Sequence, residues 1–454
     1  MEQAPRFEVD RFIDRQPFSR YQLLIIVLCG AVLSMDGFDA QAMGFVAPAL
    51  VQHLHIARAS LGPVFSSGLL GIMIGALVFG PLADRFGRKP VLVFSAVMFG
   101  LCSLLTATAG SLDTLLIFRL ATGLGLGGAM PNAVALTSEY MPKRLRATAV
   151  MVLFFGFSMG AAVGGFVAAA MIPRFGWRSV FVVGGVLPCG IALVLIPLLP
   201  ESIRFLVVKG GPQERVAKYL SKIAPGVPVP RGTSFIVEEH RSEGFLVRQL
   251  FTDGRSRMTL LLWVIYFMSL LDLYFLNAWL PTVMHDAGIA LEKAILVTSL
   301  FQVGGAVGSV TLGRVIDRLG SYRVLAWTYV AAAASVFFIG AAGASMVLLV
   351  LTISVAGFCV IGGQCGSNAL AAESYPTPIR STGVGWCFGI GRIGSIVGPM
   401  LGGVLLASQG ETRHVFWAAA IPVLIAGIAG FFAASARTAA RISESAVRTD
   451  IIPA

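Results

Sequence analysis

The stretch Leu28–Pro48, LCGAVLSMDGFDAQAMGFVAP, places two aspartates inside a segment that is otherwise apolar enough to cross a lipid bilayer. An ionised carboxylate at the middle of a membrane helix costs about 2.5–3.5 kcal/mol, so such residues usually face a protein interior or a water-filled ion or substrate path. Asp36 and Asp39 stand three positions apart and share one helical face. Because two neighbouring carboxyls in low dielectric cannot both ionise cheaply, we predict that this pair carries a proton reversibly.

The composition of the chain indicates an integral membrane protein. Of its 454 residues, 56% are hydrophobic and only 13% are charged. We attribute the net charge of +11 to basic cytoplasmic loops and not to nucleic-acid binding. The histidines and cysteines show no metal-ligand spacing, and no nucleotide loop or nucleophile motif is present, so we expect neither an enzyme nor a cofactor other than the proton as coupling ion.

Twelve apolar windows reach the length of about 20 residues that a helix needs to cross the bilayer. In the first half of the chain they lie near 21–50, 61–83, 90–109, 112–137, 147–171 and 178–198. In the second half they lie near 257–281, 292–314, 322–341, 344–371, 381–407 and 413–435. We therefore predict an all-α membrane protein, with a six-helix bundle in 1–198, a cytoplasmic linker in 199–256 and a second six-helix bundle in 257–454.

Basic residues predict the orientation of these spans. The first twenty residues lack the apolar core of a cleavable signal, so we expect a cytoplasmic N-terminus, and twelve spans then return the C-terminus to the same side. In this topology 27 of the 34 Lys and Arg residues are cytoplasmic and five lie in outer loops. This asymmetry follows the positive-inside rule. The other two, Arg119 and Arg392, lie inside spans.

The two halves repeat each other. Asp84 in GPLADRFG corresponds to Asp317 in GRVIDRLG at an offset of 233, and Glu139 corresponds to Glu373 at an offset of 234. Glycine-rich stretches in the fifth and eleventh spans also match at 234. We infer an ancestral duplication that produced two pseudo-symmetric bundles.

The motif Gly80–Lys89, GPLADRFGRK, resembles the loop signature of the major facilitator superfamily, which implies the major facilitator fold. The acidic box Asp36–Asp39 and the segment Pro200–Val208 are similar to those of the aromatic acid:proton symporters, most closely the 4-hydroxybenzoate and protocatechuate permeases. This resemblance implies a monomer in the bacterial cytoplasmic (inner) membrane that imports a small aromatic carboxylate with protons for catabolism. The chain departs from the family at Asp272 and Asn277, where we expect apolar or hydroxyl residues.

We expect proton coupling to involve four residues: Asp36, Asp39, Arg119 and Glu139. Arg119 occupies the arginine position of the superfamily in the fourth span, where it could tune the aspartates or form a structural pair with a carboxylate or the backbone. Glu139 stands at the inner end of the same span, and both a gating role and a proton-exit role remain open.

Arg392 lies about ten residues into the eleventh span, where a buried guanidinium needs an anion. Its planar fork matches a carboxylate bidentately, so its partner is either the transported acid or Asp272 of the seventh span. The aromatic residues at mid-depth are more often packing than ligand contacts, and Asn277 and Gln302 are better candidates because a buried amide needs a partner. The other candidates for substrate binding are Phe38, Asn132, Asp272, Tyr274, Asn277, Gln302 and Trp386.

We expect Glu139 and Glu373 to bridge to arginines of the loop signatures and so to close the inner face. The residues of this expected gate come from the loop signatures and the inner ends of the spans: Asp84, Arg85, Arg88, Arg146, Asp317, Arg318, Glu373 and Arg380. The function that these features favour is proton-coupled import of an aromatic carboxylate by alternating access. The alternatives are an efflux antiporter of aromatic compounds and a receptor for aromatic acids that does not transport them.

Overall fold

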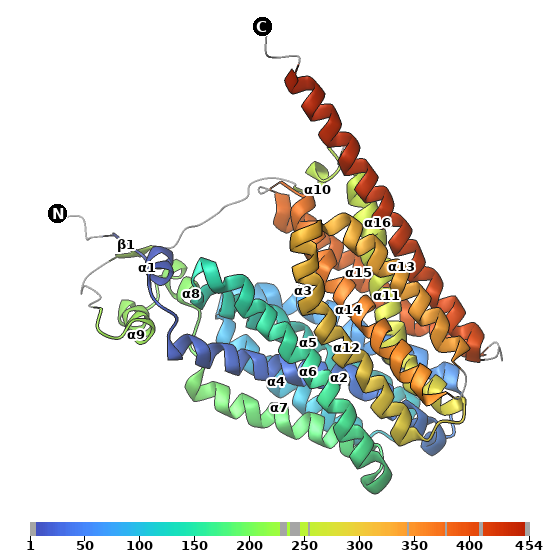
Figure 1. The fold of residues 1–454 in the computed structure, drawn as a ribbon. Helices are drawn as coiled ribbons and strands as arrows, with labels where there is room; N and C mark the ends of the chain where they lie inside the picture. The colour runs from blue at the N-terminus through green and yellow to red at the C-terminus, as the bar shows by residue number, and fades with distance from the viewer. Residues whose placement is uncertain are drawn as a thin grey trace. The chain divides into compact units, whose positions relative to one another are not determined.

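The computed structural model describes residues 6–227, 234–236, 246–252, 255–342, 345–376, 379–407 and 412–449. Within these ranges, twelve helices are long and apolar enough to cross a membrane, which confirms the predicted all-α class (Figure 1). The first six are α2 (Arg20–Leu54), α3 (Leu61–Phe86), α4 (Arg88–Ala107), α5 (Leu112–Tyr140), α6 (Lys143–Phe175) and α7 (Arg178–Leu198). The last six are α11 (Ser256–Asp286), α12 (Leu291–Leu319), α13 (Ser321–Ala341), α14 (Met346–Ser374), α15 (Arg380–Ala407) and α16 (Thr412–Thr449).

Two glycines of the repeated loop signature define the turns between neighbouring helices. Gly87 separates α3 from α4 with a φ of +104°, and Gly320 separates α12 from α13 with a φ of +87°. Both angles lie in the left-handed region, which a residue with a Cβ adopts only with strain. A Cβ on Gly87 would also collide with the carboxylate of Glu201. The glycine of the signature is therefore required by the backbone at both places.

The chain divides into two compact units. The first, here called unit 1, comprises Met1–Ala49 and Ser67–Arg241, and unit 2 comprises Leu50–Ser66 and Ser242–Ala454. The segment Leu50–Ser66, which includes the short 3₁₀ helix η1 (Arg58–Ser60), therefore groups with the second half of the chain. Hydropathy gives no indication of this grouping, because it depends on contacts between residues more than 200 positions apart.

Side chains of that segment make specific contacts within unit 2. Arg58 forms an ion pair with Asp286 at 2.9 Å, and the Ser66 hydroxyl donates to the Ile396 carbonyl at 2.7 Å. The rings of Phe65 and Trp279 meet edge to face with centroids 5.2 Å apart. These contacts hold the start of α3 against α11 and α15.

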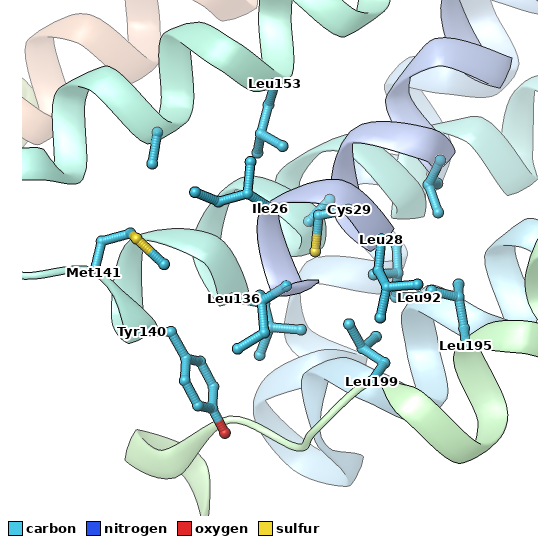
Figure 2. Close-up of a cluster of buried hydrophobic side chains, with 14 of the residues drawn as sticks. Ile26, Leu28, Cys29, Leu92, Leu136, Tyr140, Met141, Leu153, Leu195 and Leu199 are labelled. Carbon is cyan, nitrogen blue, oxygen red and sulfur yellow. The ribbon is translucent and has the colours of Figure 1, made fainter. Parts of the chain in front are cut away.

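The apolar core of unit 1 runs through its membrane helices and continues into smaller elements beyond them. Figure 2 shows Leu28, Leu92 and Leu195, which converge from α2, α4 and α7 and are all buried. The Tyr140 hydroxyl points toward the chain after Leu199 and donates to the Glu201 carbonyl at 2.6 Å (Figure 2). This bond ties the end of α5 to the segment that follows α7.

Short elements at the ends of unit 1 join the N-terminal segment to the linker. They are β1 (Arg6–Glu8), α1 (Val9–Arg15), α8 (Ile203–Val208), α9 (Gln213–Ile223) and β2 (Ser234–Ile236), which lie together in Figure 1. The strands β1 and β2 pair in parallel, and Val9 and Ile13 of α1 belong to the same buried cluster as Val216 and Leu220 of α9. Two strands can pair only on the same side of the membrane, so the chain between β1 and β2 must cross it an even number of times. The predicted topology places six spans between them and meets this requirement.

Candidate functional site

The acidic box of α2 forms a buried ion pair in unit 1. Both Nη atoms of Arg119, on α5, donate to the carboxylate of Asp39 at 2.9 and 2.8 Å. The side chains are 7% and 1% exposed, respectively. The guanidinium also lies over the Phe181 ring, 5.8 Å from its centroid. This pair is compatible with both roles left open for Arg119, since Asp39 is one of the aspartates that a neighbouring cation would tune.

The residues around Asp39 are also buried. Asp36 lies one turn earlier on α2 and is 5% exposed, so both acids of the box are inside unit 1. Phe38 is 3% exposed and fills the space beside Gly164 and Gly184, whose hydrogens allow its ring to pack closely. This packing gives Phe38 a place in the core of unit 1 and offers no support for its predicted contact with substrate.

Unit 2 contains a polar cluster on α11, α12 and α15, here called the arginine cluster: Tyr274, Asn277, Gln302 and Arg392. The Arg392 Nη1 donates to the Tyr274 hydroxyl at 3.2 Å, and the Gln302 Nε2 donates to the Asn277 Oδ1 at 3.0 Å. Tyr274 and Asn277 are one turn apart on α11 and share a face. Four of the predicted substrate-binding residues are thus brought together.

Arg392 has no carboxylate partner within the described ranges. Its guanidinium carries five N–H donors and makes one side-chain hydrogen bond, to Tyr274. The alternative pair with Asp272 does not form, because neither carboxylate oxygen of Asp272 has a hydrogen-bond partner in the described part of the chain. The geometry of α11 explains this, since Asp272 and Tyr274 are two positions apart and point about 200° from each other around the helix.

Two other predicted substrate-binding residues lie outside this cluster. Asn132 belongs to unit 1 and donates to the Gly128 carbonyl of its own helix at 2.7 Å. Trp386 is 42% exposed and stacks on Trp263, with ring centroids 5.8 Å apart. Six positions separate Trp386 from Arg392 on α15, which places the two side chains about 9 Å apart along the axis and on different faces.

The predicted bridge from Glu139 to the first loop signature is present in unit 1. The Arg88 Nε lies 3.0 Å from the Glu139 Oε1, and the Ser202 hydroxyl donates to the other carboxylate oxygen of Glu139. Glu201, to which the sequence reasoning gave no role, accepts the backbone N–H of Arg88 at 2.8 Å and of Lys89 at 3.1 Å. Its carboxylate therefore caps the N-terminus of α4, where negative charge is favoured.

The corresponding position in unit 2 contains a hydrogen bond from a hydroxyl group. Ser321 stands at the position equivalent to Arg88, and its hydroxyl donates to the Glu373 Oε2 at 2.6 Å. The residue that corresponds to Arg88 thus contacts Glu373 through a hydroxyl and not through a guanidinium.

The remaining residues of the expected gate lie at helix ends and are more loosely held. Asp84, Arg85, Asp317 and Arg318 are exposed, and no ion pair within 4.0 Å involves them in the ranges described above. The Arg146 Nε is buried without a hydrogen-bond partner there. The Arg380 Nε donates to the Tyr375 carbonyl at 3.3 Å.

Comparison with known proteins agrees with this architecture. The family model of the Major Facilitator Superfamily matches residues 27–252 and 262–453. Two solved transporters share the fold at low identity. A bacterial homologue of the lysosomal transporter Spinster has a TM-score of 0.70 at 16% identity, covering 91% of this chain and 97% of the other. The D-xylose-proton symporter has a TM-score of 0.70 at 17% identity, covering 90% and 97%.

Relatives with higher identity are transporters of aromatic acids. The 4-hydroxybenzoate transporter PcaK of Pseudomonas putida is 45% identical over 93% of this chain and 94% of its own length. The gallate transporter of Pseudomonas putida is 42% identical over 93% and 94%, and the benzoate transport protein of Acinetobacter baylyi is 32% identical over 92% and 90%. The chain therefore belongs to the major facilitator superfamily and, within it, to the aromatic acid permease family of these relatives.

Proposed function

We propose that this protein imports an aromatic carboxylate together with protons, as a monomer in the bacterial inner membrane with both termini in the cytoplasm. The observation that carries the proposal is Arg392, a membrane-span guanidinium whose only side-chain hydrogen bond in the described ranges goes to Tyr274. Since an unpaired cation inside a membrane protein is costly, this group is poised to take an anion. The relatives named above are transporters of 4-hydroxybenzoate, gallate and benzoate, and they supply the class of anion, an acid on an aromatic ring.

The arginine cluster matches a hydroxylated aromatic acid. The guanidinium can bind the carboxylate with two parallel N–H···O bonds, each worth about 1.5–3 kcal/mol. Asn277 and Gln302 are held to each other by one bond, and the other amide groups of this pair both donate and accept, as a ring hydroxyl does. The carboxylate would thus set the orientation and the amide pair would read the ring substituents.

The pair of Asp39 and Arg119 supports proton coupling. In its ionised form the carboxylate is neutralised by two charge-assisted bonds. When a proton is transferred from water to Asp39, the carboxyl becomes neutral and its attraction for Arg119 falls, so that the guanidinium is released to other partners. Loss of the proton on the other side of the membrane restores the pair. Because α2 and α5 both contribute to it, this change acts on the packing between two helices.

Uptake into proteoliposomes under an imposed pH gradient tests the proposal. Wild-type protein should accumulate labelled 4-hydroxybenzoate when the lumen is alkaline and should fail to do so when the gradient is collapsed. Asp39→Asn should abolish accumulation, measured per reconstituted molecule, because the amide cannot carry the proton. The control is Asp113→Asn, an exposed aspartate at the start of α5.

The outcomes separate the function classes. Gradient-driven loss of the acid from loaded vesicles without accumulation would indicate efflux. Binding of the acid without movement in either direction would indicate a receptor. Normal accumulation by Asp39→Asn would exclude that residue as the coupling group while leaving the transport of the acid intact.

A further inference from the structure

A second buried aspartate lies in unit 2 without the partner that the first one has. Asp272, near the midpoint of α11, is 0% exposed, and neither of its carboxylate oxygens has a hydrogen-bond partner in the described part of the chain. An ionised carboxylate in that position would be strongly disfavoured, since no cation compensates it in the described part of unit 2. The neutral acid avoids the charge and leaves only an unmade hydrogen bond.

The internal repeat assigns this residue a counterpart. At the offset of 233 that relates the two loop signatures, Asp272 corresponds to Asp39, and Pro281 corresponds to Pro48. At the offset of 234 that relates Glu139 to Glu373 on α5 and α14, the counterpart of Arg119 is Ile353, a buried apolar residue. The two units thus contain the same acidic position, with a guanidinium in unit 1 and without one in unit 2.

The helices that pack on α11 supply no substitute cation. They are α12, α14, α15 and α16, with α13 reaching α11 through Tyr329, together with α10 and η1 on the neighbouring α15. Away from their ends, Arg392 is the one charged residue among their described side chains, and it faces Tyr274 on the other side of α11. The other titratable side chains in the middle of these helices and of α11 are tyrosines and cysteines, none of which can carry a positive charge: Tyr266, Tyr274, Tyr329, Cys359, Cys365 and Cys387.

Hydrogen-bond donors do lie one turn away from Asp272. The Ser269 hydroxyl donates to the Gln364 Oε1 at 2.7 Å, and the Tyr329 hydroxyl, from α13, donates to the Ser269 Oγ at 3.0 Å. The Gln364 Nε2 is buried and donates to no group in the described ranges. Because Ser269 and Asp272 share a face of α11, this chain of neutral donors is adjacent to the acid.

We propose that Asp272 is a second proton-binding site, the counterpart in unit 2 of Asp39 in unit 1. It holds a proton as the neutral acid in the present structure. It releases that proton to water in another conformation of the cycle, where the hydroxyl and amide donors beside it stabilise the carboxylate. The inference rests on the proposed proton-coupled uptake, and it adds one proton to the number moved with each substrate molecule.

The test is the proton-to-substrate ratio in proteoliposomes, obtained from the pH gradient that just balances a fixed gradient of 4-hydroxybenzoate. Asp272→Asn keeps the shape of the side chain and cannot carry the proton, so the ratio should fall by one relative to wild type. Asp272→Leu should give the same lower ratio and serves if the asparagine variant reconstitutes poorly. Asp113→Asn, exposed on α5, should keep the wild-type ratio.

An infrared measurement provides a readout that does not depend on transport. The carbonyl stretch of a protonated carboxyl group in the purified protein should lose one component in Asp272→Asn and keep it in Asp113→Asn. An unchanged ratio in both Asp272 variants, or an unchanged carboxyl band, would overturn the second site. Uptake by the wild type that ignores the pH gradient would instead overturn the proposed coupling itself, so the two failures are distinguishable.

Discussion

Replacing Arg119 with leucine should destabilise the protein strongly, because it leaves the Asp39 carboxylate buried without a cation. The carboxylate loses both of its bonds, at 2.8 and 2.9 Å, and its side chain is only 1% exposed to solvent. Removal of one partner from such a pair costs about 3–5 kcal/mol. For a folding unit of about 200 residues this corresponds to a fall in Tm of roughly 6–20 °C.

The double variant Arg119→Leu with Asp39→Leu isolates the pair from the general effect of mutation. Replacing a buried ion pair with two apolar side chains often leaves stability unchanged or raises it. The Tm of the double variant should therefore be close to that of wild type. Asp39→Asn retains one acceptor for the guanidinium, so its Tm should lie between that of Arg119→Leu and that of the double variant. Arg174→Leu, an exposed residue at the end of α6, should leave the Tm unchanged.

The assay is thermal unfolding of the purified protein in one detergent, followed by fluorescence at a single scan rate because unfolding of membrane proteins is commonly irreversible. The reasoning would be refuted by a Tm of Arg119→Leu equal to that of wild type. It would also be refuted by a double variant no more stable than the single one, since the cost would then not arise from the unpaired carboxylate.

Three further predictions concern substrate binding and gating. Arg392→Lys should weaken binding of 4-hydroxybenzoate by about 10- to 100-fold, because one directed bond to the carboxylate is lost. Arg323→Lys, exposed on α13, should bind normally, and a binding isotherm of Arg392→Lys equal to that of wild type would exclude bidentate binding of the carboxylate by Arg392. Asp84→Ala should slow transport and leave the Kd unchanged, because this exposed side chain biases conformations without touching substrate; a parallel loss of affinity would contradict that role. Arg88→Ala should slow transport more than Ser321→Ala, because it removes an ion pair where the other change removes one bond from a neutral donor; equal initial rates would count against the difference between the units.

Much of the fold follows from hydropathy and from the repeat. Twelve apolar windows predicted the twelve spans, since a segment in lipid must satisfy its own backbone hydrogen bonds as a helix. Several helices extend beyond the predicted windows, as α6 does from Lys143 to Phe175, because polar residues at the ends continue the helix into water. The pairing of β1 with β2 and the grouping of Leu50–Ser66 with unit 2 depend on distant contacts that no local pattern encodes.

The sequence predicted the charged residues of the candidate site because a charge inside a membrane span is costly. A guanidinium and carboxylates inside spans must find partners, which is why Arg119 was expected near an acid. The choice between Asp36 and Asp39 was not readable, because both share one face of α2. For Arg392 the same reasoning allowed Asp272 as a partner, and only the direction of each side chain around α11 separates them. Glu201 was missed because its role is to accept backbone N–H groups more than 100 positions away.

The pairing of β1 with β2 has a consequence for biogenesis. The ribosome completes β1 before any span is made, whereas β2 emerges only after α7, more than 220 residues later. During insertion the first strand therefore has no partner of its own, and the parallel ladder can close only when all six spans of unit 1 have been threaded with the correct polarity. An error of one crossing would leave the two strands on opposite sides of the bilayer. Closure of this small sheet thus requires the completed insertion of the first half of the chain.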